Sequence, residues 1–465
     1  SLVERTLQSA RPVYGINTGF GHLVDVAVPA PELQQLQVNL LRSHAVGVGA
    51  PLSIDEVRAM ILLRANSLAR GYSGVRLELI QALIALLNAG VHPVIPSQGS
   101  VGSSGDLAPL AHMALVLIGE GEAIYQGSWL SGAAALDAAG LQPLELHPKE
   151  GLALINGTQM MTAVGALVLQ DAFNLVLAAE VAAAMSIDAL MGTSAAFHPK
   201  IQEIRGQPGQ IASARRMRSL LEGSSIADAH RDSDHKVQDS YSLRCVPQVI
   251  GAIRDALDFA REVVAREANA VTDNPLVLAE DQLIVSGGNF HGQPIAMALD
   301  VIGLALTQLG NFSERRTYKL LSPAESGLPA FLTTQPGSNS GLMLTQYTAA
   351  ALASENKVLA HPSSADSIPT SAGTEDFNSM GGGAALKARR IADNVSRIIA
   401  AELICAAQGL DFRRPLTSSP PVERAHTAVR AVVPQIDEDR SLGPEIEALA
   451  AVVLKGTFSE VMGTE

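Results

Sequence analysis

Two stretches of this chain, residues 163–187 and 292–312, are apolar on almost every side when drawn as helices. A helix that lacks a polar face has to be surrounded by other protein, as it is in the middle of a helical bundle. The whole chain carries only 17% charged residues, and its mean hydropathy is +0.20. A chain with so few charged residues can expose only a limited surface to water. We therefore expect a large core or extensive subunit contacts.

The remaining pattern is also mostly helical. A capping box at Ser53–Glu56 predicts a helix that runs to residue 70, and Leu77–Ala89 predicts a second one. Gly409 is expected to end a late helix. Strand signals are restricted to Ala123–Leu130, which contains a Gln-Gly turn, and Leu283–Ser286. These patterns favour a mainly α fold.

Composition also excludes several classes of partner. The net charge of −13 argues against nucleic acid and anionic membranes, which attract basic surfaces. Polar residues, prolines and glycines interrupt the longest uncharged runs, Gly151–Gln170 and Gly327–Ser354, so neither is expected to span a membrane. Two cysteines and the lack of a signal-peptide pattern predict a cytoplasmic location. Because the sequence begins at Ser1 and not at Met, we expect some N-terminal residues to be missing.

The most unusual segment is the Gly/Ser-rich stretch from Gly99 to Asp106. It lacks the Gly-Lys-Ser/Thr ending of a phosphate-binding loop, and the G-x-S-x-G pattern of a hydrolase is not met around Ser104. A third interpretation is backbone cyclisation, in which the amide nitrogen of Gly105 attacks the carbonyl carbon of Ser103. Glycine suits this reaction because it has no Cβ to block the approach. Composition alone would favour an ordinary loop.

The flanking motifs change that balance. Together with this loop they closely resemble the histidine and aromatic amino-acid ammonia-lyase family, in the family's order along nearly the whole chain. The matching segments are Tyr14–Gly21, Ser43–Ala45, Asp106–Met113, Gly151–Thr158, Gln238–Arg244, Asp273–Pro275, Ser286–His291, Ser313–Arg316 and Asp366–Ser371.

The resemblance implies that Ser103, Ser104 and Gly105 mature into 4-methylidene-imidazole-5-one (MIO), with no external cofactor. It implies an elongated helical bundle, residues 156–465, that forms a tetramer core and part of the active site. A smaller N-terminal region, residues 1–155, would carry the catalytic tyrosine and the MIO loop. It also implies a homotetramer with active sites shared between subunits. Ser103 replaces the family's usual Ala, but its side chain supplies no ring atom, so ring closure should survive.

Elimination of ammonia from an amino acid needs a base for the β-proton and a cation for the substrate carboxylate. By resemblance Tyr14 is the candidate base, Tyr241 is a second candidate for proton handling, and Arg244 is the carboxylate clamp. A free phenol has a pKa of about 10, so a catalytic tyrosine must be activated by its site. The alternatives are that Tyr14 is an ordinary core or interface residue and that Arg244 forms a surface ion pair.

Five further residues complete the expected site. Asn156 and Gln238 carry amides that could hold the MIO oxygen or the substrate carboxylate, although buried amides are often simply paired. Phe290 is expected to pack on the MIO ring or, alternatively, in ordinary core. His44 could contact the substrate ring. Glu375 matches the position where histidine-specific members carry Glu, and its alternative is an exposed loop charge.

The expected reaction is therefore elimination of ammonia from L-histidine to give urocanate, because a carboxylate can bind an imidazole N–H but is stranded against a phenyl ring. Residues 374–377 read Thr-Glu-Asp-Phe, whereas histidine-specific members usually read Gln-Glu-Asp-His. A tyrosine or phenylalanine lyase, an aminomutase, a serine-nucleophile amidase and a non-catalytic helical assembly stay open as alternatives. His230, Asp232, Asp234 and His235 share one loop, which we expect to be solvated, with no metal bound.

Overall fold

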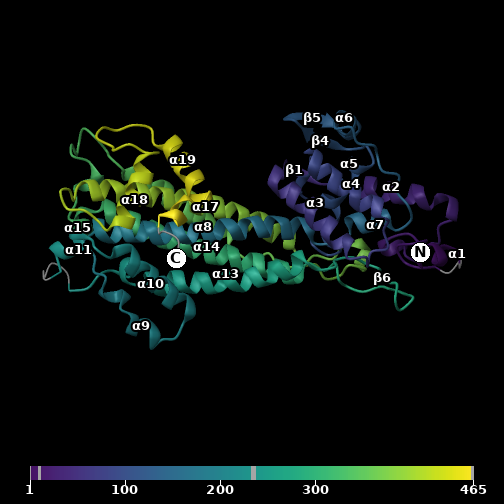
Figure 1. The fold of residues 1–465 in the computed structure, drawn as a ribbon, viewed down its shortest axis with the longest axis horizontal. Coiled ribbons are helices and arrows are strands. Elements are labelled where there is room, and N and C mark those ends of the chain that lie inside the picture. The colour runs from purple at the N-terminus through teal and green to yellow at the C-terminus, as the bar shows by residue number, and fades with distance from the viewer. Residues whose placement is uncertain (1, 9–11, 232–236, 462–465) are drawn as a thin grey trace. The chain divides into compact units, whose positions relative to one another are not determined.

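The computed structural model describes residues 2–8, 12–231 and 237–461, and these residues are mainly helical (Figure 1), which confirms the expected fold class. The described strands are short and form three small antiparallel sheets. These sheets are β1 (Val48–Pro51) with β3 (Pro96–Gln98); β2 (His92–Pro93), β4 (Glu122–Tyr125) and β5 (Ser128–Ser131); and β6 (Leu276–Leu278) with β7 (Leu283–Val285). The expected hairpin near residue 126 is confirmed, since Gln126 and Gly127 both have positive φ, as a two-residue hairpin turn requires.

The chain divides into two compact units. The first consists of Ser1–Leu167, Arg261–Asp300 and Pro362–Lys387, and the second of Val168–Ala260, Val301–His361 and Ala388–Glu465. The expected division after residue 155 is not tested by this grouping and stays a prediction. Four long helices contribute residues to both units: α8 (Gln159–Ala189), α13 (Val246–Ala268), α14 (Gln293–Leu321) and α17 (Gly381–Asp411).

Shorter helices make up most of the first unit, and α5 (Leu107–Leu117) packs against α2 (Leu33–His44) and α7 (Glu150–Ile155). The capping box is confirmed: the Ser53 hydroxyl accepts from the Glu56 backbone N–H at 3.3 Å, and the Glu56 carboxylate accepts from the Ser53 N–H at 2.9 Å. The helix expected over Leu77–Ala89 is confirmed, and Gly90 follows it in the left-handed region, a common way for a helix to end. These helices are α1 (Leu2–Gln8), α2 (Leu33–His44), α3 (Ile54–Ala69), α4 (Leu77–Ala89), α5 (Leu107–Leu117), α6 (Gly132–Ala138) and α7 (Glu150–Ile155).

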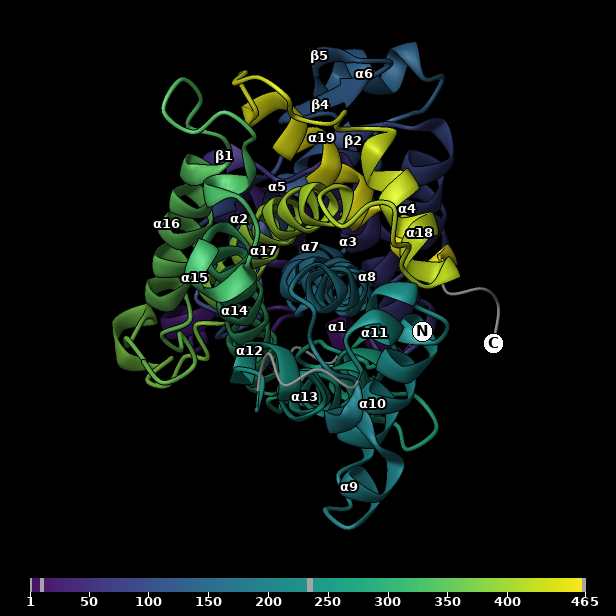
Figure 2. The same cartoon turned by 90° about the vertical axis from the view of Figure 1, so that its left-hand side faces the viewer.

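In the second unit, α8 runs between α13, α14 and α17 (Figure 2), and its side chains from 175 to 189 are almost all buried. This is the environment that its apolar sequence requires. Shorter helices surround these rods: α9 (Pro199–Glu203), α10 (Pro208–Leu221), α11 (Ser225–Ala229), α12 (Tyr241–Arg244), α15 (Pro323–Ser326), α16 (Met343–Leu359), α18 (Pro420–Arg430), α19 (Gly443–Leu454) and α20 (Thr457–Glu460).

By length and composition alone, α8 and α14 could each cross a membrane. In both helices, however, 61% of the most apolar window is buried inside the protein. A lipid-facing helix would present that surface outward, whereas burial of this extent is what a core helix shows.

The expectation that Gly409 ends a helix was wrong, because α17 continues to Asp411. A Cβ on Gly409 would lie 3.0 Å from the Cβ of Ala189 and 3.3 Å from a methyl carbon of Leu328. The residue therefore allows neighbouring segments to approach closely, and this tertiary reason for a glycine leaves no signal in the local sequence.

A buried ion pair lies among three of the long helices. Arg316 on α14 and Glu402 on α17 are both fully buried, and Nε lies 2.5 Å from the carboxylate. The hydroxyls of Ser186 on α8 and Ser313 on α14 donate to the same carboxylate at 2.8 and 2.6 Å. A buried charge of this kind is tolerated only because its partners satisfy it.

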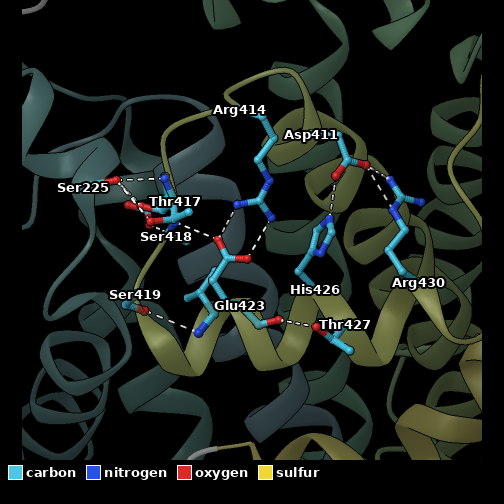
Figure 3. Close-up of polar contacts among 12 residues, drawn as sticks. Ser225, Asp411, Arg414, Thr417, Ser418, Ser419, Glu423, His426, Thr427 and Arg430 are labelled. Carbon is cyan, nitrogen blue, oxygen red and sulfur yellow. Dashed lines mark hydrogen bonds and ion pairs between the residues drawn. The ribbon is translucent and has the colours of Figure 1, made fainter.

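At the end of α17, ion pairs and caps hold α18 in place (Figure 3). Asp411 accepts from His426 at 2.7 Å and forms an ion pair with Arg430 at 2.6 Å. Arg414 donates both arms of its guanidinium to Glu423, at 2.9 and 2.7 Å. The paired charges span the turn between the two helices, so we assign this cluster a structural role.

We expect Arg316→Met to destabilise the protein by about 3–5 kcal/mol, because it leaves the Glu402 carboxylate buried without its cation. Arg390→Ala provides the control, since Arg390 and Glu355 form an exposed pair at 3.1 Å whose loss should cost about 1 kcal/mol or less. Urea denaturation followed by circular dichroism measures both. Equal losses in the two variants would contradict the importance of the buried pair.

Candidate active site

A cavity of about 500 Å³ lies within the first unit. It brings together six of the residues expected from sequence with seven others. Its lining consists of Tyr14, Gly21, Val24, Ser103, Ser104, Asn156, Asn274, Phe290, His291, Thr374, Glu375, Asp376 and Phe377. Segments far apart in the chain thus meet at the Gly/Ser-rich loop.

This loop connects β3 to α5, and neighbouring backbone holds it from several sides. The Met380 N–H donates to the carbonyl of Val101 at 2.8 Å, and the Gly292 N–H donates to that of Gly102 at 3.2 Å. The Ser379 hydroxyl donates to the same Gly102 carbonyl at 2.9 Å. The loop is therefore a fixed part of the fold.

The tightest constraint on the loop is the approach of Gly105 to Gly157. Gly105 has φ +77°, and a Cβ built on it would overlap the carbonyl group of Gly157. That carbonyl accepts the Asp106 N–H at 2.7 Å. A Cβ on Gly157 would in turn overlap the Gln159 amide and crowd the Arg64 guanidinium. Both positions require glycine for steric reasons.

Arg64 on α3 stabilises the chain around Gly157 through hydrogen bonds. It is fully buried and donates to the carbonyls of Thr272, at 2.9 Å, and of Ala153, and to the Gln159 side chain at 3.0 Å. Burial lowers its pKa to about 10, partly offset by the charge of Asp273, so the group still carries its charge near neutral pH.

Asp106 anchors the other side of the loop. Its carboxylate accepts the Ser100 hydroxyl at 2.7 Å and the Met161 N–H at 2.9 Å, and the residue is fully buried. Burial raises its pKa to about 6, although these hydrogen bonds work in the opposite direction. A group with this pKa is mostly ionised at neutral pH and becomes neutral in mild acid.

Glu375 faces the triplet directly. One carboxylate oxygen, Oε2, accepts hydrogen bonds from the hydroxyls of Ser103 at 3.0 Å and Thr370 at 2.8 Å. The other, Oε1, accepts from the Ser104 hydroxyl at 3.1 Å. The alternative interpretation of Glu375 as an exposed loop charge is wrong, because it lines the cavity and is partly buried.

Tyr14 lines the cavity, and its ring meets that of Phe20 edge-on with 6.4 Å between centroids. Burial raises the pKa of its phenol, and the charges of Glu375 and Asp273 raise it further, while a backbone hydrogen bond at Gly21 acts in the opposite sense. The described part of the first unit therefore keeps Tyr14 protonated.

His44 ends α2 and is not among the residues that line the cavity. Its Nδ1 lies 2.9 Å from the Leu40 carbonyl and 3.0 Å from the Ser43 hydroxyl. Burial lowers the pKa of its imidazole, and the Glu375 charge partly counteracts this effect.

Asn156 and Phe290 both line the cavity. The side-chain oxygen of Asn156 is buried and has no hydrogen-bond partner among the described residues. An unpaired buried amide oxygen costs free energy, so this atom is available to accept a hydrogen bond from a bound molecule.

His291 and Asn274 are among the lining residues to which sequence reasoning gave no role. The His291 ring stacks on Phe377 with 6.1 Å between centroids, and its Nε2 lies 3.0 Å from the Phe377 carbonyl. The side chain of Asn274 accepts the Gly287 N–H at 2.7 Å. Both lie in motifs that carried the family resemblance, which was the available signal.

A buried ion pair adjoins Asn274. Lys149 and Asp273 are both fully buried, with 2.7 Å between Nζ and Oδ2, and the other oxygen of Asp273 accepts the Asn274 N–H at 2.7 Å. Burial lowers the pKa of Lys149, while its ion pair with Asp273 opposes the shift. The pair thus fixes the backbone from which Asn274 reaches the cavity.

The other three expected residues, Gln238, Tyr241 and Arg244, belong to the second unit and do not line this cavity. Tyr241 is 70% exposed, and the Arg244 guanidinium lies over its ring at 4.8 Å. The Nε atom of Arg244 is buried and has no hydrogen-bond partner within the described residues. The described cavity lining contains no Arg or Lys, so it does not by itself supply a cation for a substrate carboxylate.

Three members of the loop considered for metal binding, Asp232, Asp234 and His235, lie outside the described residues. His230 is buried, and its Nδ1 lies 2.7 Å from the Ile226 carbonyl. Within the described ranges, no group of three or more His, Cys, Asp or Glu side chains could hold a metal ion.

Comparison with known proteins agrees with the motif resemblance. A histidine ammonia-lyase from Anaeromyxobacter sp. (strain K) is 54% identical over 98% of this chain and 91% of its own length. The crystal structure of a histidine ammonia-lyase from Trypanosoma cruzi superposes with a TM-score of 0.91 at 43% identity, covering 99% of this chain and 87% of that one. A tyrosine aminomutase from Streptomyces globisporus gives 0.93 at 39% identity, covering 98% and 90%. The family model for aromatic amino acid lyases matches residues 1–431, and this chain belongs to that family.

Proposed function

We propose that this chain is a histidine ammonia-lyase, which eliminates ammonia from L-histidine to give urocanate. The observation that carries the proposal is the Glu375 carboxylate, which lies 3.0 and 3.1 Å from the hydroxyls of the Gly/Ser-rich loop and lines the same cavity. The high identity to curated histidine ammonia-lyases over most of the chain supports it.

The choice of substrate follows from the acceptor that Glu375 offers. A carboxylate accepts a strong hydrogen bond from an imidazole N–H, whereas a phenyl ring would leave it desolvated and unpaired. Phe377 and His291 add a flat stacked surface to the same cavity, which suits a planar ring.

The family is the MIO-dependent class, and we infer that Ser103, Ser104 and Gly105 form this group. The Gly105 nitrogen would bond to the Ser103 carbonyl carbon, and the oxygen of that carbonyl would leave as water with the amide hydrogens of Ser104 and Gly105. Ser104 would lose its hydroxyl and α-hydrogen as a second water. The residues fit this reaction, because the loop is held rigidly and Gly105 has the positive φ and bare Cα that a compressed turn requires. When formed, the group supplies an electrophilic carbon.

The remaining roles go to the chain's own side chains. Tyr14 or Tyr241 takes the β-proton, and Asn156 offers its unpaired oxygen to a donor on the substrate. Because the first unit raises the pKa of Tyr14, a phenolate there would need a nearby cation. Arg244 is the group we assign to the substrate carboxylate.

We further propose a cytoplasmic homotetramer in which Gln238, Tyr241 and Arg244 reach the cavity of another subunit. Support comes from the lack of a cation in the described lining and from the exposed Tyr241. The two cysteines, Cys245 and Cys405, are both free thiols, as expected in a reducing compartment.

We expect Glu375→Gln to lower kcat/KM for L-histidine by roughly 10- to 100-fold, because a charge-assisted hydrogen bond to the substrate ring is lost. Urocanate formation, followed by ultraviolet absorbance, measures this, with L-tyrosine and L-phenylalanine assayed in parallel. Asp137→Asn is the control, since this carboxylate on α6 is exposed and does not line the cavity. If wild-type protein converts tyrosine or phenylalanine but not histidine, the proposed substrate is wrong.

Gly157→Ala should block maturation of the triplet, because the added methyl group clashes with the Gln159 and Arg64 side chains and moves the carbonyl against which Gly105 lies. Mass spectrometry of the intact chain should then lack the loss of two water molecules. Gly288→Ala is the matched control, as a Cβ there meets no atom within 4 Å. Full maturation of Gly157→Ala would show that this contact does not shape the loop.

A further inference from the structure

One carboxylate, that of Glu375, collects three hydroxyl groups. Thr370 and Ser103 both donate to Oε2, at 2.8 and 3.0 Å, while Ser104 donates to Oε1, at 3.1 Å. Backbone hydrogen bonds between Thr370 and Glu375 run in both directions, so the Thr370 hydroxyl is held close to its acceptor. Ser103 is only 4% exposed, which leaves its hydroxyl little access to water.

These three contacts do not all survive maturation of the triplet. Ser104 gives up its hydroxyl, so Oε1 loses that donor. Ser103 contributes only its carbonyl carbon to the ring, and its side chain stays intact. After maturation, the carboxylate therefore keeps two hydroxyl donors on Oε2, while Oε1 regains its capacity to accept a hydrogen bond in the cavity.

We propose that Ser103, together with Thr370, is a specificity-positioning residue: the two hydroxyls hold Oε2 of Glu375 so that Oε1 meets the imidazole N–H of the substrate. This inference rests on the proposed histidine lyase function and extends it to a residue of the MIO triplet itself. The Ser103 side chain acts through Glu375 and does not touch the reacting atoms.

The alternative role for Ser103 is simple space filling beside the loop. The two roles differ in what they predict for Glu375. If Ser103 acts by orienting the carboxylate, removing its hydroxyl weakens the binding of an imidazole, and the effect disappears once the carboxylate is gone. If it only fills space, its removal acts equally on all substrates and independently of Glu375.

The test is a double-mutant cycle of Ser103→Ala and Glu375→Gln in the full-length enzyme. We expect Ser103→Ala to raise the KM for L-histidine by about 10-fold with a smaller change in kcat, since one charge-assisted hydrogen bond is lost. In the Glu375→Gln background the same change should have no further effect. Peptide mass spectrometry of each variant gives the matured fraction, to which kcat is normalised. Ser128→Ala, an exposed serine on β5, is the control for expression and handling.

Thr370 keeps the proposal testable if Ser103→Ala fails to mature, because it lies outside the triplet. Thr370→Val should reproduce the rise in KM, and Thr370→Ser, which retains the hydroxyl, should restore the wild-type value. An undiminished effect of Ser103→Ala or Thr370→Val in the Glu375→Gln background would overturn the proposal. So would a histidine KM within twofold of wild type in Thr370→Val. Absence of urocanate from the wild-type enzyme would instead refute the proposed function.

Discussion

The close approach of Gly105 and Gly157 is the contact on which the candidate site depends. It leaves no room for a side chain on either residue, and the Asp106 N–H closes the gap with a hydrogen bond to the Gly157 carbonyl. Arg64 supports one side of this contact and the buried Asp106 carboxylate supports the other. Ordering this turn costs conformational entropy, and packing and buried hydrogen bonds in the first unit offset that cost.

Charge in the first unit is arranged around this turn. Two cations, Arg64 and Lys149, and two carboxylates, Asp106 and Asp273, are fully buried, and each has hydrogen-bonding partners. Glu375 is different, since it lines the cavity and is only partly buried. The buried charges hold backbone in place, whereas Glu375 is a charge that a ligand in the cavity can reach.

Much of this arrangement could be predicted from sequence, and the failures have physical causes. The triplet, Tyr14, Asn156, Phe290 and Glu375 were predicted because they lie in recognisable motifs, and the structure gathers them around one cavity. The stacking of His291 on Phe377 depends on tertiary contacts that no local pattern encodes. For the same reason Gly409 looked like a helix end, although it lies in close packing inside α17. Gln238, Tyr241 and Arg244 were predicted from the same motifs, but they belong to the second unit and do not line this cavity.

The buried Arg316–Glu402 pair, whose carboxylate also accepts hydrogen bonds from Ser186 and Ser313, limits which substitutions this core can accept during evolution. An apolar core of the same volume could be equally stable, but reaching it requires both charges to disappear. Each route made of single substitutions passes through a chain with one buried, unpaired charge. The two charged residues are thus retained less because the pair is strong than because a chain with only one of them is too unstable.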